Sequence, residues 1–250
     1  MELRFIRPYW KCADNVEALC TTRYGGLSSH PYKSFNLGLH VGDDVNCVEG
    51  NRSLLKNATG CENLVFVNQI HGTGVKVVTS CHSEPVVDAD ALVTDVPGVA
   101  LAIMTADCLP VLLAHSSGKV IGNAHAGWRG LCAGVLENTL QHMNCNPEDI
   151  TAYLGPCIDV KSFEVGAEVR EQFLAKDSEC SNCFIPGSRE GKYFANLPFL
   201  ARRTLVMAGV PSSAIFGGFW STFRQDWLFY SYRRDGGKTG RMASLVWLKK

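Results

Sequence analysis

The chain has 250 residues, of which 46% are hydrophobic and 19% are charged, so it can bury a large core without help from disulfide bonds. Lys and Arg together number 24, and Asp and Glu together also number 24. A protein whose main partner is a polyanion needs clustered positive charge, which this balanced composition does not indicate. The composition therefore argues against a nucleic-acid partner.

The first residues and the cysteines indicate the compartment. Residues 1–11 alternate charged and apolar side chains with no apolar segment behind them, so we expect no secretory signal. The longest apolar stretch, residues 99–104, is far too short to span a bilayer, and we expect no membrane partner. The number of cysteines is 11, which is odd, and thiols in a reducing compartment are usually free, buried or metal-bound. These features predict a cytoplasmic protein.

Apolar segments of strand length recur along most of the chain. In chain order, the predicted strands cover residues 18–22, 64–68, 75–79, 91–94, 99–104, 111–114, 120–124, 151–154, 214–217, 228–232 and 243–247. Four helices are predicted among them. They are residues 48–56, a segment after Gly130, a segment in which positions 165, 169 and 173 are apolar, and a helix that is capped by Asn196 and ends at Gly209.

The order of these elements predicts the fold class. Strands follow one another in runs instead of alternating strictly with helices, which favours an α+β fold with mixed sheets. We expect two sheets packed together, with helices outside them. The Gly-rich and Ser-rich segments at 24–29 and 235–238 are short enough to be turns, not linkers, so residues 1–250 are predicted to form a single domain.

Three segments place reactive side chains beside small residues at strand ends. They cover residues 68–72, 105–110 and 124–130, and they contribute His71, Cys108 and His125. Imidazole nitrogen and thiolate sulfur are preferred ligands of Zn²⁺, and three protein ligands leave a fourth position for water. An open site of this kind lowers the pKa of bound water toward neutrality and supplies a nucleophile. These residue types predict a mononuclear zinc site.

The same residues support a second hypothesis. Cys108 could be a thiolate nucleophile with His125 or His71 as its base, as in cysteine hydrolases. The two hypotheses exclude one another in a given state, because a metal bound to Cys108 would quench its nucleophilicity. A third possibility is a buried, inert cysteine beside histidines that only satisfy hydrogen bonds. The residues alone leave all three open.

Charged residues accompany these segments. Arg129, at the expected start of a helix, is a candidate to hold a phosphate or carboxylate, and Arg23 and Arg233 are further candidates. Each of them could equally form a surface salt bridge. Asp107 is a candidate general base or partner of a metal ligand, or else a turn cap. The acidic segment 88–95 lacks the ligand density of a calcium site and is expected at a turn or strand edge.

At these motifs the sequence resembles the YfiH-type family, also called the laccase-domain or multicopper polyphenol oxidase family. The resemblance covers essentially the whole chain. Its motifs are, in order, Thr21-Thr22-Arg23, Gly25-Gly26-Leu27-Ser28, Phe35-Asn36-Leu37-Gly38, Gly42-Asp43, Asn68-Gln69-Ile70-His71-Gly72, Asp88-Ala89-Asp90-Ala91, Thr105-Ala106-Asp107-Cys108-Leu109-Pro110, His125-Ala126-Gly127-Trp128-Arg129-Gly130, Gly155-Pro156-Cys157-Ile158, Phe163-Glu164-Val165-Gly166 and Ser231-Tyr232-Arg233-Arg234-Asp235. Because so many motifs occur in one order, the resemblance is specific.

The resemblance implies a four-layer α/β/β/α sandwich and a zinc site at His71, Cys108 and His125. It also implies purine nucleoside chemistry, namely phosphorolysis of adenosine, inosine, guanosine and methylthioadenosine, together with adenosine deamination. Members have also been described as copper-dependent phenol oxidases, and a bacterial branch is called a peptidoglycan editing factor. The alternatives are therefore a cysteine-type amide hydrolase that edits a peptidoglycan precursor and a copper-dependent phenol oxidase.

The number of histidines helps to choose among these activities. A true multicopper oxidase needs about ten His and Cys ligands. This chain has 7 histidines, and only two of them lie in the motifs above. One open zinc ion suits hydrolytic deamination, and Arg129 with Arg23 or Arg233 would hold the phosphate that phosphorolysis needs. We therefore predict a zinc-dependent purine nucleoside phosphorylase with adenosine deaminase activity.

This prediction assigns roles to single residues. Asp107 is expected to assist proton transfer, and Arg129 is expected to anchor phosphate. The residues expected to bind the substrate are Arg23, Asn36, Gln69 and Arg233. Zinc is the expected metal, with copper as the other possibility, and purine nucleosides and phosphate are the expected partners. The oligomeric state, a monomer or a homodimer, is left open.

Overall fold

A computed structural model describes residues 2–250. The helices are α1 (Val45–Thr59), α2 (Trp128–Ala133), α3 (Val135–Met143), α4 (Ala167–Lys176) and α5 (Leu197–Met207). The strands are β1 (Phe5–Ile6), β2 (Val16–Thr21), β3 (Asn63–Val65), β4 (Val75–Val78), β5 (Ala91–Thr94), β6 (Val99–Thr105), β7 (Leu109–His115), β8 (Ile121–Ala126), β9 (Ile150–Leu154), β10 (Glu164–Gly166), β11 (Phe184–Pro186), β12 (Lys192–Ala195), β13 (Ile215–Gly217) and β14 (Met242–Leu248). Within residues 2–250, no helix is both long enough and apolar enough to cross a membrane.

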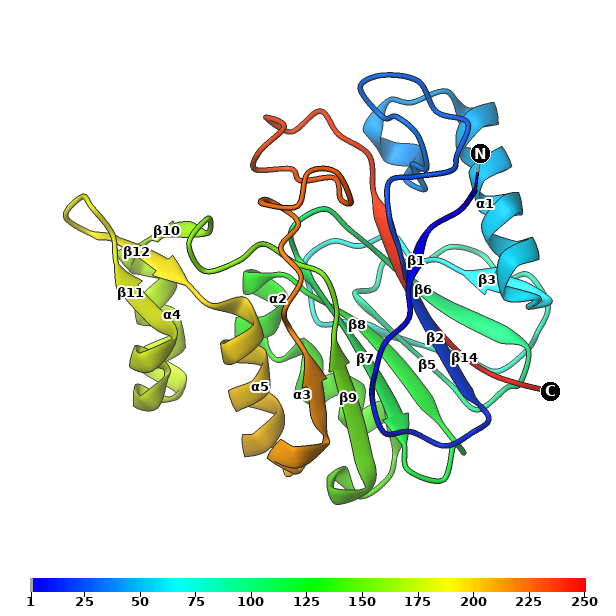
Figure 1. Ribbon diagram of the computed structural model, residues 1–250. Helices are drawn as coiled ribbons and strands as arrows, with labels where there is room; N and C mark the ends of the chain where they lie inside the picture. The colour runs from blue at the N-terminus through cyan, green and yellow to red at the C-terminus, as the bar shows by residue number, and fades with distance from the viewer. Residues whose placement is uncertain (1) are drawn as a thin grey trace.

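Two large sheets form the centre of the molecule (Figure 1). The five-stranded sheet has the order β1-β2-β14-β6-β3, and the six-stranded sheet has the order β13-β9-β7-β8-β5-β4. Both sheets are mixed, because β3 pairs with β6, β4 with β5 and β13 with β9 in parallel, while the other neighbours are antiparallel. Helix α1 covers the outer face of the first sheet, and α2, α3 and α5 lie on the outer side of the second (Figure 1). This arrangement confirms the predicted four-layer α/β/β/α sandwich.

The alternation of side chains along the central strands explains the layers. In β6, Leu101 and Ile103 pack between the two sheets, whereas Ala100 and Ala102 belong to the apolar cluster that contains Leu55 of α1. Every residue of β6, β7 and β14 is buried, because each strand is covered on both faces. This double burial explains why the sequence shows continuous apolar runs here.

The predicted helices are confirmed with shifted bounds. Helix α5 begins after Asn196, whose side chain accepts a hydrogen bond of 3.1 Å from the backbone N–H of Phe199. The helix expected after Gly130 is instead two helices, α2 and α3. They are separated at Gly134, which has a φ of 110° that favours glycine.

Two expectations about the elements are wrong. Residues 228–232 form no strand, because they lie in an irregular loop where Phe229 and Tyr230 are fully buried beside Met242. Val165, expected in a helix, lies in β10, which pairs with β12 in a small third sheet of order β10-β12-β11. The strands of this sheet are too short to show a period in the sequence. That residues 1–250 form one domain stays a prediction.

Candidate metal centre and substrate cavity

His71, Cys108 and His125 come together although they lie on different elements. His71 follows β3, Cys108 lies in the turn that joins β6 of one sheet to β7 of the other, and His125 is on β8. Their donor atoms all lie within 4.8 Å of one another, and Nε2 of His71 is 3.9 Å from Sγ of Cys108. Among residues 2–250, this is the only group of three or more His, Cys, Asp or Glu side chains with such a spacing.

Close backbone packing around the three side chains depends on glycine. His71 has a φ of 60°, so the chain turns sharply at this residue. A Cβ atom on Gly127 would lie 3.0 Å from Sγ of Cys108, and one on Gly130 would lie 2.7 Å from the carbonyl oxygen of Gly72. The start of α2 approaches the site this closely because neither position carries a side chain.

Asp90 holds two of the three candidate ligands in place. Its buried side chain lies directly before β5. Oδ1 accepts hydrogen bonds from Nδ1 of His125 at 2.8 Å and from the backbone N–H of His71 at 2.9 Å, and Oδ2 accepts one from Gly72 at 2.6 Å. Burial opposes the ionisation of Asp90, but the hydrogen bonds from His125 and Gly72 outweigh it, so the pKa of this carboxyl is lowered. The sequence indicated only a turn or strand-edge role here.

The two adjacent imidazoles control the ionisation of Cys108. Burial would raise the pKa of the thiol, but His125 and His71 outweigh that effect and lower the pKa to about 6. Burial likewise opposes a charge on His125, but Cys108 and Asp90 favour it, so the pKa of His125 is raised to about 9. The pair is therefore a thiolate beside an imidazolium at neutral pH, which suits either a metal ligand or a nucleophile.

The donor set and its spacing fit a zinc ion. Sulfur and nitrogen ligands of a tetrahedral zinc site lie roughly 3.6 Å apart, given the usual bond lengths. The 3.9 Å between Cys108 and His71 is close to that separation. Because Nδ1 of His125 is bound to Asp90, Nε2 is the nitrogen left to coordinate, and a carboxylate behind the imidazole is the usual arrangement in metal sites. Three donors leave one position open.

A cavity of about 450 Å³ contains these three side chains in its wall. Aromatic rings come from Trp128, Phe163 and Tyr232. Positive charge comes from arginine, and the lining arginines are Arg129, Arg233 and Arg241. Asp107 is the one acidic residue of the lining within the part of the chain that the structure describes. A cavity of this size, apolar with a few polar groups, suits a small organic ligand that carries negative charge.

Two of the expected substrate residues and the expected phosphate anchor line this cavity. They are Gln69, Arg233 and Arg129. The guanidinium of Arg129 lies 4.5 Å from the ring centroid of Trp128, and that of Arg233 lies 5.5 Å from the ring centroid of Phe163. The side-chain amide of Gln69 both donates to and accepts from the backbone of Met104 at 2.8 Å, so it pins its own segment to β6.

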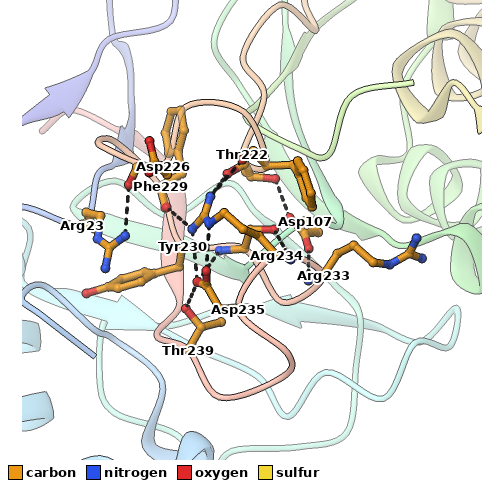
Figure 2. Close-up of polar contacts among 12 residues, drawn as sticks. Arg23, Asp107, Thr222, Asp226, Phe229, Tyr230, Arg233, Arg234, Asp235 and Thr239 are labelled. Atoms are coloured by element: carbon orange, nitrogen blue, oxygen red, sulfur yellow. Dashed lines mark hydrogen bonds and ion pairs between the residues drawn. The ribbon is translucent and has the colours of Figure 1, made fainter. Parts of the chain in front are cut away.

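Arg23 and Asn36 are not brought into the cavity wall. Arg23 donates a hydrogen bond of 3.0 Å to the carbonyl oxygen of Asp226 and lies over the ring of Tyr230 (Figure 2). Asn36 is fully buried, and its Oδ1 accepts a hydrogen bond of 2.9 Å from the backbone N–H of Arg241. These contacts give both residues a role in supporting the segments around the cavity, and their expected contact with the substrate stays a prediction.

Asp107 connects the turn at Cys108 to the loop over residues 221–240. Its φ is 98°, and its carboxylate accepts hydrogen bonds from Oγ1 of Thr222 at 2.6 Å and from the backbone N–H of Arg233 at 2.7 Å (Figure 2). Both carboxylate oxygens are therefore already hydrogen-bonded. The part of Asp107 in proton transfer stays a prediction.

Arg234 is the centre of the loop that carries Tyr232 and Arg233 (Figure 2). Its guanidinium donates to the carbonyl oxygens of Thr222 at 2.7 Å and Phe229 at 2.9 Å. Nε donates to Asp235 at 2.8 Å. Burial opposes the ionisation of Asp235, but the hydrogen bonds from Arg234 and Thr239 outweigh it, so the pKa of Asp235 is lowered. This ion pair stabilises the loop whose residues Tyr232 and Arg233 form one wall of the cavity.

We expect Asp235→Asn to destabilise the protein at pH 7 by about 1–3 kcal/mol, because the guanidinium of Arg234 loses its charged acceptor. A carboxyl whose folded pKa is lowered stabilises the fold above its unfolded pKa of about 3.9, and this contribution is lost as the pH falls through the folded pKa. The difference in unfolding free energy between the variant and the natural protein should therefore shrink below pH ~4.

Urea unfolding at a series of pH values measures this difference. Asp226→Asn is the matched control in the same loop, because Asp226 is exposed and contributes only its backbone oxygen to Arg23. A difference for Asp235→Asn that is as large at pH ~3 as at pH 7 would contradict the ionic explanation.

The comparison with known proteins gives the family. Residues 17–249 match a family model described as multi-copper polyphenol oxidoreductase laccase. The chain belongs to this family. The resemblance to YfiH-type proteins seen in the motifs is thereby confirmed.

Relatives of similar length cover almost the whole chain. A Haemophilus influenzae protein named purine nucleoside phosphorylase is 44% identical over 249 residues, which are 99% of this chain and 100% of the relative. The Escherichia coli protein named purine nucleoside phosphorylase YfiH is 46% identical over 248 residues, 98% and 99% of the two chains. The crystal structure of a Neisseria meningitidis protein is similar with a TM-score of 0.92 and 44% identity, covering 98% of this chain and 99% of that one.

Proposed function

We propose that this protein is a purine nucleoside phosphorylase that depends on a zinc ion held by His71, Cys108 and His125. The observation that carries the proposal is the placement of these three donors in the wall of a cavity that also presents aromatic rings and arginines. The relatives named purine nucleoside phosphorylase support the same class of reaction. The proposed substrates are adenosine, inosine, guanosine and methylthioadenosine, and adenosine deamination is proposed as a second activity.

The residues of the cavity suit both reactants. Trp128 and Phe163 offer ring surface against which a purine can stack. Arg129 forms no ion pair with any of residues 2–250, so its guanidinium is free to bind oxygen atoms of a ligand, and its expected role as the phosphate anchor stays a prediction. Zinc, when bound, would supply a Lewis acid that polarises a ligand oxygen.

In phosphorolysis, an oxygen of phosphate forms a bond to C1′ of the ribose while the bond from C1′ to the purine nitrogen breaks. The electron pair of that bond stays on the purine, which takes up the proton that the hydrogen phosphate loses. The products are ribose 1-phosphate and free purine. Asp107 is our candidate to assist this proton transfer, because it is the acidic residue of the cavity lining.

The test is metal analysis followed by nucleoside turnover with and without phosphate, on one sample of protein. We expect one zinc ion per chain and release of free purine only when phosphate is present, with ribose 1-phosphate formed in equal amount. Arsenate in place of phosphate is a useful control, because it should also support purine release. Purine release that does not depend on phosphate, or no release from any of the four nucleosides, would contradict the proposal.

One observation favours a second candidate function, a cysteine-type amide hydrolase that edits a peptidoglycan precursor. The pKa of Cys108 is about 6, and His125 lies between Cys108 and Asp90, as the base does in a cysteine hydrolase. This function predicts hydrolysis of an amide that persists after chelation and stops after thiol alkylation. The phosphorylase predicts that chelation alone stops turnover.

A copper-dependent phenol oxidase is less well supported by the residues present. The chain has 7 histidines, and the described residues hold a single cluster of candidate ligands. A trinuclear copper cluster with a separate blue-copper centre needs more donors than this. The metal analysis described above also shows whether the single site holds copper instead of zinc. A cytoplasmic location and a monomeric or homodimeric state stay predictions.

A further inference from the structure

Arg241 is held in a fixed position in the cavity wall. Its backbone N–H is bound by Asn36, and Nη1 donates to the carbonyl oxygens of Thr239 at 3.0 Å and Gly240 at 3.2 Å. Its stem packs against Gly38, where a Cβ atom would lie 2.9 Å from Cγ of the arginine. Nε and Nη2 donate to no protein acceptor among residues 2–250, so one edge of the guanidinium is free.

No carboxylate of residues 2–250 forms an ion pair with this guanidinium. Arg203 and Arg234 each pair with an aspartate, whereas no ion pair within residues 2–250 includes Arg241. His40 also lines the cavity, where its imidazole N–H is available to donate a hydrogen bond to an anion. Burial lowers the pKa of His40, and the charges of Arg241 and Arg52 lower it further. Cys108 and Asp107 act on the charge of Arg241 without forming an ion pair with it, so the free edge of the guanidinium can still accept an anion as its direct partner.

None of the three arginines of the lining forms an ion pair within residues 2–250, but Arg241 differs from the other two because its side chain is partly buried. Arg129 and Arg233 are exposed, although all three guanidinium groups lie over an aromatic ring, that of Arg241 at 5.8 Å from the ring centroid of Tyr232. The side chains of Arg129 and Arg233 have to be ordered when a ligand binds, which weakens the net interaction. The guanidinium of Arg241 is already ordered and partly removed from water, so the same contact should be stronger there.

We propose that Arg241, with His40 beside it, forms the subsite for the phosphate group in this cavity. Nε and Nη2 are the two donors of a guanidinium that bind two oxygens of one oxyanion side by side. The inference rests on the proposed function, in which inorganic phosphate is the co-substrate and attacks C1′. The phosphate ester of a nucleotide has the same chemistry, so the experiment separates these two sources.

The test measures binding of inorganic phosphate and of adenosine 5′-monophosphate by calorimetry, and KM for phosphate and for inosine by turnover, on metal-loaded protein. Arg241→Gln should weaken phosphate binding and raise KM for phosphate roughly tenfold or more, because a charge-assisted pair of hydrogen bonds is lost. The KM for inosine should stay unchanged. Arg241→Lys should recover part of the lost phosphate binding, because it restores the positive charge but not the two parallel N–H donors of a guanidinium.

Two further variants keep the test decisive. Gly38→Ala retains the charge but displaces the side chain of Arg241, and it should also raise KM for phosphate. Arg7→Gln removes one positive charge that pairs with Glu17 outside the cavity, and it should change nothing. An unchanged near-ultraviolet circular dichroism spectrum and an unchanged KM for inosine show that the variants are folded.

The outcomes are distinguishable. If Arg241→Gln and Gly38→Ala bind inorganic phosphate as the natural protein does, the subsite is wrong. If adenosine monophosphate binds through Arg241 but inorganic phosphate does not bind at all, the assignment to the co-substrate is overturned. If phosphate binding depends on Arg241 while the natural protein releases no purine, the subsite stands and the proposed function fails.

Discussion

A Cys108→Ala variant is expected to lose its bound metal and its phosphorolytic turnover together. The thiolate is the one anionic donor of the proposed set, and a pKa of about 6 keeps it ionised at neutral pH. Removing a residue that merely supports a ligand weakens metal binding about 10–100-fold, so removing a ligand should weaken it by more. Metal content after gel filtration in buffer with limiting zinc, and purine release by the same sample, measure both losses.

The control for this variant is Cys47→Ala. Cys47 lies on α1 and does not line the cavity, so metal content and turnover should both be retained. A Cys108→Ala protein that is free of metal and retains full turnover would refute a metal-dependent reaction. His71→Ala then separates the two candidate functions. It removes one metal donor but leaves Cys108, His125 and Asp90 in place, so only a cysteine hydrolase should stay active.

The strands of the two central sheets were predictable because a strand that is buried on both faces is a continuous apolar run in the sequence. Every residue of β6 and β7 is buried, and such runs are visible without knowing the partner strands. Residues 228–232 have the same apolar character for another reason, burial of Phe229 and Tyr230 beneath a loop. A short apolar run reports burial and does not reveal whether its backbone pairs with another strand.

The candidate ligands were predictable for a different reason. His71, Cys108 and His125 each stand beside small residues at a strand end, and zinc prefers their donor types. Asp90 gave no such signal, because its role depends on contacts with segments about 20 and 35 positions away in the chain. Arg241 lies outside every motif.

Arg23 and Asn36 show that a residue in a family motif need not line the cavity. Both stand in motifs that the family resemblance marks, and both support other residues instead of lining the cavity. A motif identifies residues that a fold or a site needs, and only the three-dimensional contacts separate the two roles. Asn36 does not line the cavity, but it accepts a hydrogen bond from the backbone of Arg241, which does. Asn36 therefore affects the shape of the cavity indirectly.

Asp90→Asn is expected to weaken zinc binding about 10–100-fold, the usual effect of losing the carboxylate behind a histidine ligand. Both oxygens of Asp90 accept hydrogen bonds, from Nδ1 of His125 and the backbone of His71 on one side and from Gly72 on the other. An amide has one acceptor oxygen, so its NH₂ group must face an N–H donor whichever way it is turned. The metal-free protein should therefore also lose about 1–3 kcal/mol of its free energy of unfolding.

Zinc affinity measured by chelator competition, with the electronic spectrum of the cobalt-substituted protein, tests this role without using turnover. A tilted His125 should alter the cobalt spectrum, which a general loss of stability would leave unchanged. Asp88→Asn is the matched control, because Asp88 is exposed and accepts a hydrogen bond only from Asn68 at 2.6 Å. If Asp90→Asn is less stable yet binds zinc as tightly as the natural protein, Asp90 supports the loop alone and His125 needs no carboxylate to bind the ion.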